Sequence, residues 1–170
     1  QARTLTSTQI VGVTTAQLGA MVGAQFAAIS SVALKGLTTT QAGVLSTIQS
    51  AALTSAQAAA LSGTQLGALT TDAVTGLGTG VIGVLSSAQL AGFDTSDVQA
   101  LTTSQFASVG TAAVKGLTTS QAGVLSTDQV RVLTTAAVGA LSGTQLGALT
   151  TDAVSGLTST QVGVLNSAQV

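Results

Sequence analysis

The sequence predicts an all-α solenoid, a superhelical coil of very short helices with one helix for each eight-residue repeat. Three observations predict it. From Leu5 to Val170 the chain consists of consecutive octads without insertion or deletion, twenty complete copies and a last one of six residues. Each octad carries a helix-start signal. The chain is 45% hydrophobic with a net charge of −1, so it should bury apolar surface despite its low complexity.

Two segments divide the chain. Residues 1–4 precede the first octad and are expected to be a frayed lead-in. Residues 5–170 are expected to form a single repeat domain of about 21 octads. The last octad ends after six residues, so we expect the stack either to continue in a longer chain or to associate end to end.

The helix-start signal is a capping box, as in Leu117-Thr118-Thr119-Ser120-Gln121-Ala122-Gly123-Val124. Position one is apolar in all 21 octads, position two is Ser, Thr, Asp or Asn in 18, and position five is Gln in 14. The position-two side chain can accept from the N–H of position five, and the Gln can accept from the N–H of position two. Such short helices cannot stand alone in water and must be held by stacking.

A β-solenoid is the alternative, because Thr and Val favour strands. A strand would alternate apolar and polar residues. In these octads two polar residues stand together at positions two and three, and Gln, Ala and Leu suit helices. The pattern therefore favours helices.

A longer period, in which five octads form a 40-residue unit, is superimposed on the octads. Ala replaces Gln at position five in Ala33, Ala73, Ala113 and Ala153, and each is followed by a Gly at position eight. We expect five octads to form one turn, so that four turns make a rod of roughly 40 Å. The alternative is that the period records duplication and that two octads form a turn. An 80-residue period is also present, since residues 60–74 recur unchanged as 140–154.

The Gln at position five has a second expected role. A partly buried amide must be paired, so the Gln side chains could form a ladder of amides between stacked turns, each bonded to the next. Gly at positions seven and eight suits helix ends and close approach of turns.

The composition argues against catalysis. The chain has no His and no Cys, which removes the commonest metal ligands and acid–base groups. Asp94 and Asp97 are close in sequence and could bind Ca²⁺, but they stand at N-cap and N3 positions, where carboxylates favour helix starts. We therefore expect no enzyme, no catalytic, cofactor-binding or metal-binding residues, and no cofactor.

Two classes of partner are also unexpected. Four Lys and Arg residues cannot form the basic footprint that nucleic acid needs. No run of 18 apolar residues is present, so no transmembrane segment is expected.

The octads resemble octapeptide-repeat segments of large bacterial secreted and cell-surface proteins of the adhesin-like kind, as in Leu37-Thr38-Thr39-Thr40-Gln41 and Leu149-Thr150-Thr151-Asp152. The resemblance implies a location outside a bacterial cell. The expected function is that of a rigid extracellular solenoid, a stalk, spacer or filament subunit. The alternative is a surface module that binds ice or carbohydrate through the regular Ser and Thr hydroxyls of positions two and three.

Overall fold

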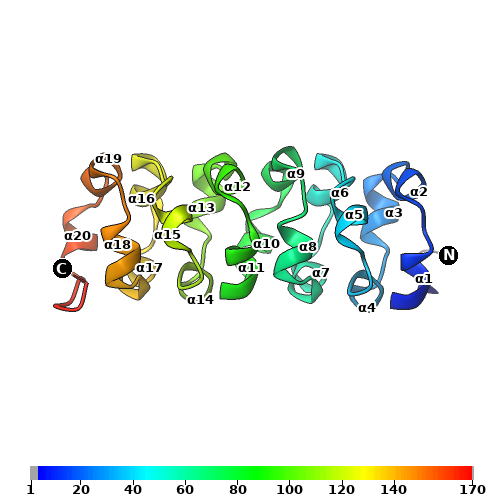
Figure 1. The fold of residues 1–170 in the computed structure, drawn as a ribbon, viewed down its shortest axis with the longest axis horizontal. Helices are drawn as coiled ribbons and strands as arrows, with labels where there is room; N and C mark the ends of the chain where they lie inside the picture. The colour runs from blue at the N-terminus through cyan, green and yellow to red at the C-terminus, as the bar shows by residue number, and fades with distance from the viewer. Residues whose placement is uncertain (1–3, 170) are drawn as a thin grey trace.

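The computed structural model describes residues 4–169, which form an elongated stack of short helices without any strand (Figure 1). The helices are α1 (Ser7–Val11), α2 (Thr15–Gly19), α3 (Gly23–Ala27), α4 (Ser31–Leu34), α5 (Thr39–Ala42), α6 (Thr47–Ala51), α7 (Ser55–Ala60), α8 (Gly63–Leu66), α9 (Thr71–Gly76), α10 (Thr79–Ile82), α11 (Ser87–Gly92), α12 (Thr95–Ala100), α13 (Thr103–Ala107), α14 (Thr111–Val114), α15 (Thr119–Ala122), α16 (Thr127–Val132), α17 (Thr135–Ala140), α18 (Gly143–Gly147), α19 (Thr151–Ser155) and α20 (Ser159–Val162). The all-α prediction is confirmed over this part of the chain, and the β-solenoid alternative is wrong. Of the expected lead-in, residues 1–3 lie outside the described residues.

Most helices begin as the octad predicts. Thr118 has extended backbone angles, φ −73° and ψ 161°, and its Oγ1 accepts a hydrogen bond of 3.1 Å from the backbone N–H of Gln121. The Oε1 of Gln121 accepts a bond of 2.8 Å from the N–H of Thr118. The capping box therefore supplies acceptors for two N–H groups that a helix start leaves without partners. Val22, Gly78 and Gly110 have no side-chain acceptor at this position.

The corners between helices need no special residue. No described residue, glycine included, has a positive φ. Gly123, at the C-cap of α15, has φ −66° and ψ −12°, and Leu125 closes the turn by donating its N–H to the carbonyl of Ala122 at 3.2 Å. The next N-cap is extended, so ordinary L-residues can form the whole corner. The glycines at helix ends are therefore not left-handed caps, contrary to the usual reason for glycine there.

One turn of the coil contains between three and four octads. The helices that pack together most are always three apart in sequence, such as α1 with α4, α6 with α9 and α16 with α19. Side-chain hydrogen bonds between turns join residues that are 28 and 31 positions apart. The predicted turn of five octads is therefore wrong, and so is the alternative of two. With three to four octads in each turn, the chain makes about six turns, and the rod is roughly 50 Å long at ordinary helix spacing.

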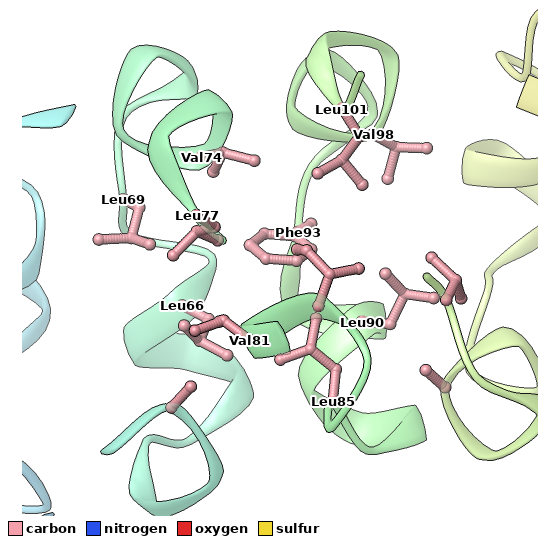
Figure 2. Close-up of a cluster of buried hydrophobic side chains, with 14 of the residues drawn as sticks. Leu66, Leu69, Val74, Leu77, Val81, Leu85, Leu90, Phe93, Val98 and Leu101 are labelled. Carbon is pink, nitrogen blue, oxygen red and sulfur yellow. The ribbon is translucent and has the colours of Figure 1, made fainter. Parts of the chain in front are cut away.

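The interior of the coil is filled by the side chains of positions one and six. Between α4 and α17, every position-one side chain and every apolar position-six side chain is buried. Figure 2 shows Phe93 extending across the centre toward Leu77, with Leu85, Leu90 and Val81 below it. Inside such a narrow coil, each turn buries its apolar side chains only against its neighbours, so the stack has one continuous core.

The 40-residue period coincides with one set of close approaches between turns, and Gly63, Gly67, Gly92 and Gly143 make others. A Cβ built on Gly36, Gly76, Gly116 or Gly156 would collide with a backbone carbonyl oxygen of the preceding turn, which for Gly116 is that of Ser87. Only glycine fits such an approach. The glycines belong to the octads of α4, α9, α14 and α19, in which Ala replaces Gln. In Figure 1, α4 and α14 lie along one edge of the rod, and α9 and α19 along the opposite edge. A shift of ten octads therefore returns to the same edge, which explains why the repeat is more exact at ten octads than at five.

Candidate functional surfaces

The most regular polar feature is a row of buried glutamines at position five, each of which bonds an earlier turn. The row comprises Gln41, Gln49, Gln57, Gln65, Gln89, Gln105, Gln121, Gln129, Gln145, Gln161 and Gln169. Gln121 is 2% exposed, and its Nε2 donates to the carbonyl of Leu90 at 3.0 Å and to that of Phe93 at 2.6 Å. These acceptors lie at position six and at the following position one, 31 and 28 positions earlier in the chain.

Both expected roles of the glutamine are present in one side chain. Its Oε1 completes the local capping box, and its Nε2 holds the neighbouring turn, so every polar atom of the buried amide is paired. The expected ladder of amide to amide is wrong in one respect. The acceptors are main-chain carbonyls, because the amide oxygen is already occupied by the N-cap N–H. The row is therefore a set of structural clamps.

Asp97 is the one acidic member of this register. It is 1% exposed, its Oδ2 accepts from the N–H of Asp94 at 3.2 Å, and its Oδ1 accepts from Thr71 Oγ1 at 3.1 Å. Asp94 caps α12 through its own carboxylate, at 2.8 Å from the N–H of Asp97. Burial is the main cause that raises the pKa of Asp97, and the nearby Asp94 adds to it. The predicted helix-start roles of both carboxylates are confirmed.

The remaining charges form no candidate ion site. Among residues 4–169 no three His, Cys, Asp or Glu side chains lie together as metal ligands could. Arg131 and Asp128 form an ion pair of 3.3 Å on the surface of α16, where such pairs contribute little. No helix in the described part of the chain is long and apolar enough to cross a membrane.

Many of the Ser and Thr hydroxyls are engaged within the coil, chiefly those of position two. At position two they accept cap bonds, as for Thr118. At position three some bond the following turn: Ser55 Oγ donates to the carbonyl of Gly80 at 2.9 Å, and Thr127 Oγ1 to that of Asp152 at 3.0 Å. Because consecutive octads lie on different sides of the rod (Figure 1), these hydroxyls wind around it.

The two ends of the rod differ from its middle and from each other. At the N-terminal end, Gln9, Gln17 and Gln25 are exposed, unlike the later glutamines of position five. At the C-terminal end, Leu146, Val154, Leu157, Leu165 and Gln169 line an apolar hollow of about 370 Å³ together with Gly143 and Gly147. These residues occupy the same octad positions as buried residues elsewhere, and only their place in the stack exposes them. The sequence therefore gives no signal that distinguishes them.

Part of the chain matches a known repeat. Residues 103–135 and 124–151 match the sequence model of the ALTTAQ repeat family. The match supports the octads as a recognised type of repeat and extends over less than half of the chain. No curated protein and no solved structure matches this chain.

Proposed function

We propose that this chain is a structural protein, a rigid solenoid that serves as a stalk, spacer or filament subunit outside a bacterial cell. The observation that carries the proposal is the row of buried glutamine clamps. They join successive turns from Gln41 to Gln169, so the backbone of each turn is fastened to the next along the rod. The proposal assigns no catalytic role to the chain.

A spacer should keep its cross-section and change its length when repeats are removed. Deleting residues 61–140 joins two copies of the same local sequence, since residues 60–74 recur as 140–154. For a rod, the long dimension measured by small-angle X-ray scattering should fall by roughly half, whereas the dimensions of a compact globule would fall by roughly a fifth. An unchanged cross-section with the larger fall supports the proposal, and the smaller fall contradicts it.

The extracellular location is tested separately. Antibodies against the exposed surface of the rod should label intact cells of the source organism as strongly as lysed cells. Labelling that requires lysis would contradict the location without affecting the spacer role.

The alternative of an ice- or carbohydrate-binding face has less support, because the hydroxyls wind around the rod and many are engaged in cap bonds. A thermal-hysteresis assay and a glycan array test it. Clear hysteresis, or specific binding that is lost when exposed threonines along one edge are replaced by alanine, would favour it over the spacer.

A further inference from the structure

We propose that these rods associate side by side, with one charged edge of a rod lying against the oppositely charged edge of a second copy of the chain. The inference goes beyond the spacer role, which a single rod can fill. It names an interaction surface along the length of the rod and identifies the partner as another copy of the chain.

The charged side chains are separated onto two opposite edges of the rod. All five Asp of the chain lie in α9, α12, α16 and α19 or at the N-cap of α12. These helices lie along one edge in Figure 1, which we call the acidic edge after its members Asp72 and Asp152. Lys35 and Lys115 are the C-cap residues of α4 and α14. Those two helices lie along the opposite edge, which we call the basic edge (Figure 1).

Four of these charges are free to meet a partner. They are exposed, and within residues 4–169 no ion pair or hydrogen bond engages their side chains: Lys35, Lys115, Asp72 and Asp152. The remaining charges of the acidic edge are already engaged. Asp128 pairs with Arg131 at 3.3 Å, and the carboxylates of Asp94 and Asp97 accept hydrogen bonds at the start of α12.

The charge alternates along the chain in step with the edge. In the octads of α4, α9, α14 and α19, position seven is Lys, Thr, Lys and Ser, and position four is Val, Asp, Ala and Asp. A cation therefore recurs on one edge only, and an anion on the other only. The preference of helix ends for cations and of helix starts for anions applies equally in all four octads. That preference alone does not account for the alternation.

The two edges have the same spacing of charges. Lys35 and Lys115 are 80 positions apart, and so are Asp72 and Asp152. Ten octads correspond to roughly 25–30 Å along the rod at ordinary helix spacing. Two neighbouring rods can therefore form two ion pairs at once. Parallel rods shifted by five octads pair Lys35 with Asp72 and Lys115 with Asp152, and antiparallel rods pair Lys35 with Asp152 and Lys115 with Asp72.

Exposed apolar side chains accompany the charges on both edges. Val32, three residues before Lys35 in α4, is 62% exposed. On the acidic edge, Ile48 of α6 is 71% exposed. Its neighbour Thr47 donates from Oγ1 to the carbonyl of Asp72 at 3.2 Å, so Ile48 lies next to the turn that carries Asp72. Surface ion pairs contribute little by themselves, and burial of these apolar side chains adds to the contact.

The distribution of charge excludes a symmetric contact between like edges. Two basic edges would bring Lys against Lys without any Asp, and two acidic edges would bring carboxylates together. The contact therefore joins unlike edges. Each rod has one edge of each kind, so every added copy leaves a free edge, and the association can extend into a sheet of rods.

Exchange of the charges tests this contact. The first variant, Lys35→Glu/Lys115→Glu, reverses the basic edge. The second variant, Asp72→Lys/Asp152→Lys, reverses the free charges of the acidic edge. A fourfold variant combines all four substitutions, which restores unlike edges and the net charge of the wild type.

The matched control adds charge away from both edges. It is Thr40→Glu/Ser120→Glu, at exposed positions of α5 and α15, which lie between the edges in Figure 1. Sedimentation velocity over a concentration series, at low and at high ionic strength, measures association. Circular dichroism checks that each variant is folded.

The wild type and the control should associate equally at low ionic strength and less at high ionic strength, because salt screens exposed charges. The first and the second variant should each associate with themselves at least ~10-fold more weakly. A mixture of these two variants, and the fourfold variant alone, should regain the affinity of the wild type.

Three results would overturn the inference: a wild type that stays monomeric at all soluble concentrations, a first or second variant that associates as well as the wild type, or a folded fourfold variant that does not associate. Equal weakening in the control would overturn it as well. Scattering at high ionic strength measures single rods, so the spacer role is tested independently of this contact.

Discussion

Replacing the amide of Gln121 by a carboxylate tests the clamp directly. Gln121→Glu keeps the oxygen that accepts from Thr118 and removes both bonds to Leu90 and Phe93. Two lost bonds cost about 1 kcal/mol each. A buried carboxylate oxygen then faces two carbonyl oxygens, which repel it, and it has no compensating donor. With this cost included, the expected loss of unfolding free energy is about 3–5 kcal/mol at pH 7.

The destabilisation should depend on pH. Burial raises the pKa of the introduced carboxyl in the folded state above its unfolded value. The folded state therefore binds the proton more tightly, and the loss should shrink as pH falls through the folded pKa. Urea unfolding followed by circular dichroism at pH 7 and at pH 4 measures both effects.

Gln9→Glu is the matched control for this prediction. Gln9 makes the same capping bond at 3.0 Å but is exposed at the N-terminal end. In dilute solution its replacement should be neutral or stabilise by about 0.3–0.5 kcal/mol, because a carboxylate suits a helix start. Equal losses for the two variants, or a loss in Gln121→Glu that does not change with pH, would refute the clamp.

Three further predictions use single sites. Gly116→Ala should destabilise the protein by about 2–3 kcal/mol in urea unfolding, because the new Cβ would meet the backbone of Ser87. Gly78→Ser, at an N-cap with open space around it, should instead stabilise the protein by about 0.5–1 kcal/mol. The opposite order of stabilities would contradict the close approach of the turns at Gly116. Ser50→Ala should stabilise by about 1 kcal/mol, because Ser50 Oγ is buried without a hydrogen-bond partner; a loss of thermal stability would contradict that burial. Burial raises the pKa of Asp97 in the folded protein, so its side chain contributes most to the stability of the fold below the unfolded pKa, and this contribution is lost as pH rises through the folded pKa. Asp97→Gln should therefore raise the melting temperature at pH 7, and should raise it less at pH 4.

The local structure could be predicted from the sequence because its signals are local. Position-two hydroxyls and position-five glutamines lie three residues apart, and the capping box they form needs no information from elsewhere in the chain. The inward direction of positions one and six follows from the same register. The capping box is present in α1, between Thr6 and Gln9, and again in α20, between Thr158 and Gln161.

The length of the turn could not be predicted in the same way. It depends on the angle at each corner, which is set by ordinary backbone conformations that many residues adopt. The visible 40-residue period instead marks close approaches such as that of Gly116 to Ser87. Those approaches alternate between opposite edges of the rod, so their spacing is not the pitch.

The second function of the glutamines, and the difference between the ends of the rod and its middle, could not be predicted from the sequence either. The capping box explained Gln121 without its second function, because the carbonyls it binds are 28 and 31 positions away. Gln9 and Gln121 stand in equivalent octads and differ only in whether an earlier turn lies beneath them. Sequence spacing carries no signal for that difference.

Spin labels can show directly that one turn contains between three and four octads, and not five. The chain has no cysteine, so spin labels can be attached to Thr127→Cys/Asp152→Cys and to Thr127→Cys/Ser167→Cys. Thr127 Oγ1 bonds the carbonyl of Asp152, 25 positions away, at 3.0 Å. Electron spin resonance should show strong dipolar broadening for the first pair and a much longer distance for the second. A short distance between positions 127 and 167, which are five octads apart, with a long one between 127 and 152, would show that a turn contains five octads.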